Sequence, residues 1–224
     1  MPSVLITGAN RGIGLELSRQ FAADGWRVIA CCRDPSRASA LDGIASGIHA
    51  LDVADPRAIA ALGETLAGET IDVLLNNAGV YGERQSFGTI DSAEWRHVFQ
   101  VNAIAPVLMA EAFLQQVARS QRRIIASITS RMGSIGDNSG GGSIVYRSSK
   151  AALNAAMKSL AIDLAPKGIT CVVLHPGWVR TEMGGGNAPM APTDSARGLR
   201  GVIGRLTSAD SGRFLNYDGE ELPW

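Results

Sequence analysis

The chain has 224 residues, of which 46% are hydrophobic and 19% charged, and its formal net charge is zero. This length suits one α/β domain over residues 1–224. The absence of a basic block argues against nucleic acid or an anionic membrane as partner. No apolar run is long enough to span a membrane. Three scattered histidines suggest no metal site. Three cysteines without Cys-x-x-Cys spacing predict reduced thiols in a cytoplasmic protein. A strand pattern that starts too early to leave room for a signal peptide also favours the cytoplasm.

A short apolar strand at residues 4–6 leads into a glycine-rich turn and then an amphipathic helix that ends near Gly25. Glycines let the backbone approach a pyrophosphate, and a helix N-terminus offers free N–H groups and a positive dipole end. The spacing is G-x-x-x-G-x-G rather than the G-x-G-x-x-G of the general dinucleotide fingerprint. A glycine-rich turn without a ligand is the alternative, but the flanking strand and helix favour a nucleotide. The predicted cofactor contacts of this turn are Gly8, Asn10, Arg11, Gly12, Ile13 and Gly14.

The second predicted strand, residues 27–32, ends where many dinucleotide folds carry an acid that binds the adenosine ribose. Here that place is held by Cys32, and Arg33 follows. A guanidinium suits a 2′-phosphate, and Arg11 in the glycine turn offers a second positive charge. Asp34 is a competing signal one residue further on. We therefore predict NADP(H), with NAD(H) as the alternative.

Two further strand ends, which follow predicted strands at residues 48–51 and 71–75, carry candidate cofactor contacts. Asp52, followed by Val53, either accepts a hydrogen bond from the adenine amino group or caps the helix that starts near residues 55–56. The second strand end places small and amide residues where cofactors lie in a doubly wound sheet. These residues are Asn76, Asn77, Ala78 and Gly79.

A helix predicted over residues 91–117 carries Asn102 among apolar neighbours. Pro106 stands four residues later, so it would clash with the carbonyl group of Asn102 and leave that carbonyl free for water. An amide that merely satisfies a helix kink is the alternative. The next strand, predicted over residues 123–130, ends in hydroxyls and is followed by a glycine-rich loop that reaches residue 143.

Tyr146 and Lys150 lie four residues apart at the start of the next predicted helix, and so on one face, one turn apart. A tyrosine has an ordinary pKa of about 10, and a cation held beside the phenol favours the phenolate and lowers that pKa. Tyr-x-x-x-Lys alone is a weak signal, because any exposed helix can carry it. The pattern gains meaning from the cofactor cradle and from the hydroxyl-bearing strand end.

The rest of the chain continues the alternation of strand and helix. A strand over residues 169–174 is followed by Pro176-Gly177 and Thr181. A glycine run at residues 184–186 predicts a flexible substrate lid over residues 182–197. A helix predicted at residues 193–206 precedes an edge strand predicted at residues 212–217. This order predicts a single α/β domain of the doubly wound Rossmann type, with a parallel sheet of about seven strands and helices on both faces.

With these pieces in place, the chain resembles the short-chain dehydrogenase/reductase family over nearly its whole length. The resemblance rests on Thr7-Gly8-x-x-x-Gly12-x-Gly14, Asp52-Val53, Asn76-Asn77-Ala78-Gly79, Asn102, Ser130, Tyr146-x-x-x-Lys150 and Pro176-Gly177-x-x-x-Thr181, in the family's order. The glycine-rich segment before Tyr146 and two further segments, Cys32-Arg33-Asp34-Pro35 and Asn216-Tyr217-Asp218-Gly219, are most similar to the carbonyl reductase, C-factor and sniffer-like subgroup.

This resemblance implies a catalytic tetrad in which Tyr146 donates a proton to the substrate oxygen and Ser130 orients that oxygen. Lys150 would hold the nicotinamide ribose and lower the pKa of the tyrosine. Asn102 would seat a water that links Lys150 to solvent. Thr181 and the backbone near Val179 would hold the carboxamide. Reduction of a carbonyl builds negative charge on oxygen, which itself calls for a placed proton donor.

Two departures from the family pattern are visible. Ser130 lies 16 residues before Tyr146, whereas many members have a gap of 13, a position held here by Gly133. Ser127, Ser134 and Ser143 are the other hydroxyls nearby, and Ser130 is preferred because it ends the strand. The segment after Thr181 is short, which suggests an open site and leaves the substrate undefined.

The leading hypothesis is an NADPH-dependent reductase of a small ketone or aldehyde, reversible in principle. The protein is expected to form a homo-oligomer, either a dimer or a tetramer. A cofactor-binding signalling protein of the C-factor type, with little turnover, is the alternative from another class, although the complete tetrad argues against it. An epimerase or dehydratase acting on nucleotide sugars would need a longer chain with a substrate domain.

Overall fold

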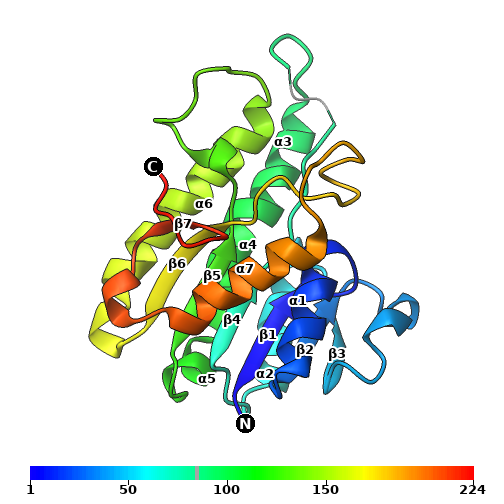
Figure 1. Ribbon diagram of the computed structural model, residues 1–224, viewed down its shortest axis with the longest axis vertical. Helices are drawn as coiled ribbons and strands as arrows, with labels where there is room; N and C mark the ends of the chain where they lie inside the picture. Colours follow the sequence, from blue (N-terminus) through cyan, green and yellow to red (C-terminus); the bar gives the residue numbers. More distant parts are fainter. Residues whose placement is uncertain (84–85) are drawn as a thin grey trace.

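A computed structural model describes residues 1–83 and 86–224, and in these residues a seven-stranded parallel sheet forms the centre of the molecule (Figure 1). The strand order is β3-β2-β1-β4-β5-β6-β7, with register pairs such as Val4 with Val28 and Leu5 with Leu74. The strands are β1 (Ser3–Thr7), β2 (Arg27–Cys32), β3 (Gly47–Ala50), β4 (Val73–Asn76), β5 (Ile124–Ile128), β6 (Thr170–His175) and β7 (Phe214–Asn216). The predicted doubly wound Rossmann-type fold is therefore confirmed.

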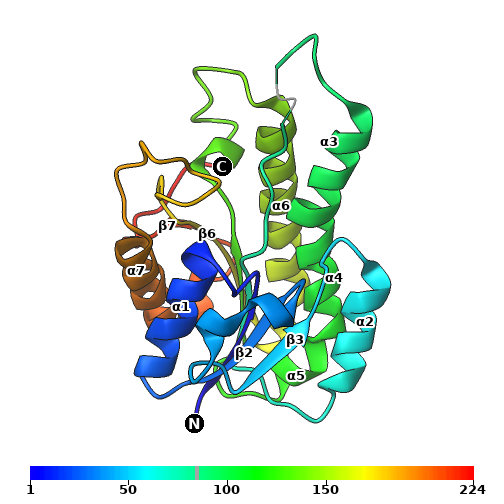
Figure 2. The ribbon, with the colours of Figure 1, turned by 90° about the vertical axis from the view of Figure 1, so that its right-hand side faces the viewer.

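Helices cover both faces of the sheet and explain why its strands are near-continuous apolar runs (Figure 2). α1 (Gly12–Ala23) and α7 (Pro192–Arg205) pack on one face, while α2 (Pro56–Thr65), α4 (Ala105–Ala112), α5 (Leu114–Ala118) and α6 (Ile144–Asp163) pack on the other. α3 (Ser92–Phe99) precedes α4 and contacts α6. No helix of the described residues is both long and apolar enough to cross a membrane.

The region predicted as one helix over residues 91–117 is instead α3, a π-helical turn, α4 and α5. The π-helix covers Gln100–Ile104, with the N–H of Ala105 bonded to the carbonyl of Gln100 five residues back. Phe113 separates α4 from α5 because its backbone leaves the helical region, with φ −106° and ψ 11°. The irregularity near Asn102 thus begins before Pro106, as a widened turn rather than as a clash with the proline ring.

The carboxyl ends of β1 and β4 meet where the strand order reverses. Thr7 joins them, because its hydroxyl oxygen accepts from the backbone N–H groups of Asn77 and Ala78, each at 3.0 Å. Such a reversal leaves a crevice beyond the strand ends, which is the usual ligand site of this architecture. The segments that follow β4, β5 and β6 all start at this edge.

Candidate active site

The glycine turn after β1 is a tight backbone cradle at the N-terminus of α1. Gly8 and Gly12 have φ of +64° and +54°, a region that favours glycine. A Cβ at Gly14 would overlap the carbonyl oxygen of Gly8 and the side chain of Asn77. α1 begins at Gly12 after Arg11, whose side chain makes no capping hydrogen bond, so the first N–H groups of the helix remain suited to an anion.

The strand end after β4 holds this cradle in place. The Asn77 amide donates to the carbonyl oxygens of Thr7 at 2.8 Å and Gly8 at 3.1 Å, so its side chain fixes the start of the turn. A Cβ at Gly8 would lie 3.1 Å from the Cα of Ala78. A Cβ at Gly79 would lie 3.3 Å from Oδ1 of Asn102 and 3.6 Å from Nζ of Lys150, so this glycine lies between the cradle and the candidate catalytic residues.

The charged residues near the predicted adenosine end have different partners. Arg33 is exposed directly beyond β2. Asp34, the competing signal, accepts hydrogen bonds from the backbone N–H and hydroxyl of Ser36, which hold the pKa of its carboxyl below its usual value. The guanidinium of Arg11 forms an ion pair with Glu182. Arg33 is therefore better placed for a phosphate than Asp34 is for a ribose.

Of the two roles predicted for Asp52, helix capping is wrong. Asp55 caps α2 by accepting from the N–H of Arg57 at 2.8 Å. Asp52 accepts instead from the N–H of Ala54 at 2.9 Å within a turn, and it is exposed, whereas Val53 beside it is buried.

The catalytic candidates from β5 and α6 converge on one buried cluster. Ser130 lies two residues beyond β5, accepts from the N–H of Met132 at 3.1 Å, and is hydrogen-bonded to the Tyr146 side chain. Lys150 donates from Nζ to the carbonyl oxygen of Ile128 at 2.8 Å, and its Nζ lies 5.9 Å from the centre of the Tyr146 ring. Ser130, Tyr146 and Lys150 are 7%, 8% and 4% exposed, so the cluster is largely dry.

Burial shifts the pKa values of this pair in opposite directions. Burial, with a smaller contribution from Tyr81, raises the pKa of Tyr146 to about 12, although its hydrogen bond to Ser130 acts in the opposite direction. Burial also lowers the pKa of Lys150 to about 8. The lysine therefore does not depress the pKa of the phenol below 10 in this structure. A phenol that stays protonated suits a proton donor.

Gly133, at the position that the shorter family gap would select, packs against α6. A Cβ there would lie 2.8 Å from the backbone carbon and from the Cβ of Lys150. Any side chain at residue 133 would push the helix away, so a hydroxyl cannot be placed there without moving Lys150. Ser130 is the hydroxyl that contacts the phenol.

Asn102 is fully buried and its side chain is used for positioning. Its Oδ1 accepts from the N–H of Val80 at 2.9 Å, and its Nδ2 donates to the carbonyl of Val80 at 2.8 Å and to Oγ of Ser149 at 3.0 Å. The π-helical turn in which it lies widens the helix at this point, a feature frequent at functional sites.

Sequence reasoning missed Tyr81, whose ring packs on that of Tyr146 with 4.7 Å between the centroids. An aromatic residue two positions after Asn76-Asn77-Ala78-Gly79 was the available signal, because that strand end reaches the same edge of the sheet. Its packing partner lies 65 residues later, which no local pattern reveals.

The segment after β6 includes the substrate lid predicted over residues 182–197, whose last part is helical. α7 already begins at Pro192, and the preceding loop is closed by its own hydrogen bonds, including Trp178 Nε1 to the carbonyl of Gly184 at 2.8 Å and the N–H of Arg180 to the carbonyl of Met190 at 2.8 Å. Thr181 accepts from the N–H of Gly184, and its methyl group lies beside Gly12. Val179 is buried at the base of this loop.

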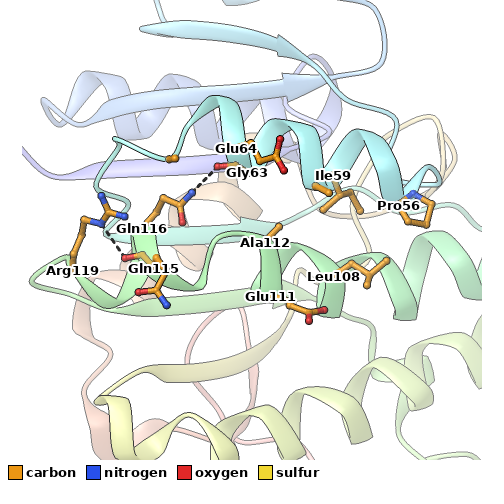
Figure 3. A pocket seen from close by; sticks show the side chains of 12 residues that line it. Pro56, Ile59, Gly63, Glu64, Leu108, Glu111, Ala112, Gln115, Gln116 and Arg119 are labelled. Carbon is orange, nitrogen blue, oxygen red and sulfur yellow. Dashed lines mark hydrogen bonds between the residues drawn. The ribbon is translucent and has the colours of Figure 1, made fainter.

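A separate surface hollow of about 470 Å³ lies between α2 and the α4–α5 pair (Figure 3). Apolar residues such as Ile59 and Leu108 line it, and the Gln116 amide donates across it to the carbonyl of Gly63 at 2.9 Å. None of the described residues that line it belongs to the proposed catalytic or cofactor set, so this hollow is distinct from the crevice.

Comparison with known proteins places the chain among oxidoreductases. The family model described as short chain dehydrogenase matches residues 2–191. C-signal of Myxococcus xanthus is 46% identical over 154 residues, covering 69% of this chain and 93% of that protein. Carbonyl reductase Sniffer of D. melanogaster is 35% identical with a TM-score of 0.92 and full coverage of both chains. The NADPH-bound carbonyl reductase from chicken fatty liver is 36% identical with a TM-score of 0.91, covering 100% of this chain and 99% of that one.

Proposed function

The chain belongs to the short-chain dehydrogenase/reductase family of oxidoreductases, in the subgroup of carbonyl reductases and C-factor-like proteins, and we propose that it reduces a ketone or aldehyde to an alcohol with NADPH. The observation that carries this proposal is the buried contact of a phenol with a hydroxyl, beside a lysine, at the sheet edge that also bears the glycine cradle. Residues 1–224 would act as one dinucleotide-binding and catalytic domain.

The residues around the cradle fit a dinucleotide phosphate. The uncapped start of α1 would bind the pyrophosphate, and exposed Arg33 would pair with a 2′-phosphate. Arg11 already has a carboxylate partner in Glu182, so Arg33 would contribute more to NADPH preference. Bound NADPH would supply the hydride. The remaining predicted cofactor contacts are Asn10, Ile13, Asp52, Val53, Asn77, Ala78, Gly79, Tyr146, Val179 and Thr181.

The chemistry assigned to the chain's own residues is placement of the carbonyl oxygen and donation of one proton. Ser130 and Tyr146 would both hydrogen-bond the oxygen, and Tyr146 would transfer its phenol proton as negative charge develops there. Lys150 would contact the nicotinamide ribose. The widened turn at Asn102 would offer a backbone carbonyl to a water that reconnects Lys150 with solvent. The reaction would be reversible, with the phenolate of Tyr146 accepting the proton in the alcohol-oxidising direction.

A second candidate function is cofactor-dependent signalling, which is favoured by the 46% identity to C-signal. NADPH oxidation measured with a panel of ketones and aldehydes separates the two functions. Turnover of at least one carbonyl with NADPH supports the reductase. Tight NADPH binding without turnover of any of them supports signalling instead.

We also propose a cytoplasmic homo-oligomer, a dimer or a tetramer. Ile104 and Ile162 are 44% and 65% exposed, on the π-helical turn and on α6, and both would be covered by a second copy. Light scattering coupled to gel filtration tests this assembly, and a monomeric mass at micromolar concentration contradicts it.

A further inference from the structure

Tyr81 lies on the segment between β4 and α3, and it contacts both α6 and the residue that precedes this helix. Its ring packs on that of Tyr146, with 4.7 Å between the centroids and 38° between the planes. Its hydroxyl is hydrogen-bonded to Oγ of Ser143 at 2.7 Å. Because Ser143 immediately precedes α6, one side chain joins the start of the helix to the candidate proton donor within its first turn.

The backbone before Tyr81 is held independently of the tyrosine side chain. The buried Asn102 amide bonds both the N–H and the carbonyl of Val80, and it also donates to Ser149 on α6. Ser149 in turn donates to the carbonyl of Tyr146 at 2.8 Å. The point from which Tyr81 projects is therefore fixed relative to the helix that carries Tyr146.

Ser143 has an unusual backbone conformation for a residue other than glycine. Its φ is +44° and ψ +42°, and it follows Gly141 and Gly142, which also have positive φ. This conformation costs a residue with a Cβ about 1–2 kcal/mol, a cost that glycine avoids. A serine at such a position is accounted for if its hydroxyl has a role, and the bond to Tyr81 is the role that the structure shows.

We propose that Tyr81 is a positioning residue that, anchored by Ser143, shields the phenol of Tyr146 from water and fixes its ring for proton donation. This inference rests on the proposed reductase function, since only a proton donor needs such shielding. A ring stacked at this distance replaces water on one side of the phenol. Water around a phenol favours the charged form, so its exclusion keeps the proton on the oxygen.

The other groups around the phenol do not replace this effect. The hydroxyl of Ser130 favours the phenolate through its hydrogen bond, whereas an ionised Tyr81 would disfavour it. The Lys150 ammonium lies 5.9 Å from the ring centre and is bonded to the carbonyl of Ile128. Arg131, on the turn after Ser130, is paired with Asp137. Loss of the Tyr81 ring should therefore move the titration of Tyr146 to lower pH.

The test compares Tyr81→Leu, which removes the ring, with Tyr81→Phe, which keeps the ring and removes the bond to Ser143. The third tyrosine of the chain gives the matched control, Tyr217→Phe. The pH dependence of kcat/KM is measured for NADP-dependent alcohol oxidation, which needs the phenolate, with the alcohol of the best carbonyl from the panel. In Tyr81→Leu the rise should occur about one pH unit lower, and in Tyr81→Phe, which loses only the anchor, a smaller shift in the same direction is expected. In the Tyr217→Phe control the rise should move by less than about 0.3 unit, and NADPH affinity should stay within about twofold in all three.

An unchanged profile in a folded Tyr81→Leu variant would overturn the inference, because mere structural damage lowers the rate at every pH without shifting the profile. Absorbance titration of the tyrosines follows phenolate formation without needing turnover, so it tests the inference even if the proposed reductase function is wrong. Tyr146→Phe identifies the step that belongs to Tyr146, and that step should also fall by about one pH unit in Tyr81→Leu, even in a protein without turnover. If Tyr81→Leu does not fold, Ser143→Gly removes the anchor and keeps the backbone conformation; a smaller shift in the same direction is then expected, and no shift overturns the inference.

Discussion

The proposed cofactor cradle and the proposed proton-donating cluster lie at the same edge of the sheet but are built in different ways. The cradle consists mainly of backbone, and it leaves no space for a Cβ at Gly14 beside the carbonyl oxygen of Gly8. The cluster consists of buried side chains from three segments, with the pKa values of Tyr146 and Lys150 shifted in opposite directions. The comparison indicates that the cradle depends on shape, whereas the cluster depends on the exclusion of water.

The largest effect is expected where the cradle leaves no space. Gly14→Ala places a methyl group on the carbonyl oxygen of Gly8 and the Asn77 amide, so the turn must open. We expect a loss of roughly 3 kcal/mol in the free energy of unfolding and at least about 100-fold weaker NADPH binding. Chemical denaturation and NADPH fluorescence measure these changes.

The matched control for Gly14 is Gly204→Ala, on α7, where a Cβ meets no atom within 4 Å. This control should be neutral or slightly stabilising, since alanine favours a helix. Equal behaviour of the two variants would show that the cradle does not depend on shape.

In the cradle, stability and NADPH binding should fall together, whereas in the cluster a loss of activity should come with a gain in stability. Lys150→Met removes a buried amine whose pKa of about 8 lies below its usual value of 10.5, so burial of its charge costs about 3 kcal/mol at pH 7. Loss of its hydrogen bond to Ile128 offsets about 1 kcal/mol. We therefore expect a variant that is roughly 2 kcal/mol more stable at pH 7 but at least about 100-fold less active.

The pH dependence of stability separates this explanation from simple repacking. Between pH 8 and 10.5 the unfolded wild-type chain binds more protons than the folded one, so its free energy of unfolding rises with pH. The advantage of Lys150→Met should shrink over this window. An advantage that stays constant from pH 7 to 10 would contradict a charged, buried lysine.

A smaller effect is expected at the exposed end of the cradle. Arg33→Asp should lower the NADPH to NADH ratio of kcat/KM by about 10- to 100-fold, because a charged hydrogen bond contributes about 1.5–3 kcal/mol. Arg57→Asp, an equal charge change on α2, is the control and should leave the ratio unchanged. If Arg33→Asp behaves like this control, Arg33 does not bind the 2′-phosphate.

The fold and the cradle could be predicted from the sequence because their constraints are local. Apolar strand runs, the spacing of Gly8, Gly12 and Gly14, and the Tyr146–Lys150 spacing each act within a few residues. The upward shift of the Tyr146 pKa could not be predicted, since it arises mainly from burial by segments that are distant in the sequence, with a smaller contribution from Tyr81, 65 residues earlier. The π-helical turn at Asn102 was predicted only as a break, because Pro106 marks the place but not the form. The hydrogen bonds that Trp178 and Arg180 make within the loop around the glycine run after Thr181 could not be predicted, because they join residues that no local pattern pairs.

The central claim is that Tyr146 donates the proton in an NADPH-dependent carbonyl reduction. The most direct measurement compares NADPH binding and single-turnover NADPH oxidation in wild type and Tyr146→Phe, with the best carbonyl from the panel. Because the variant keeps the ring and loses only the hydroxyl, NADPH affinity should stay within about twofold, while the rate should fall by at least about 100-fold. A variant that reduces the carbonyl within about tenfold of the wild-type rate would contradict the claim.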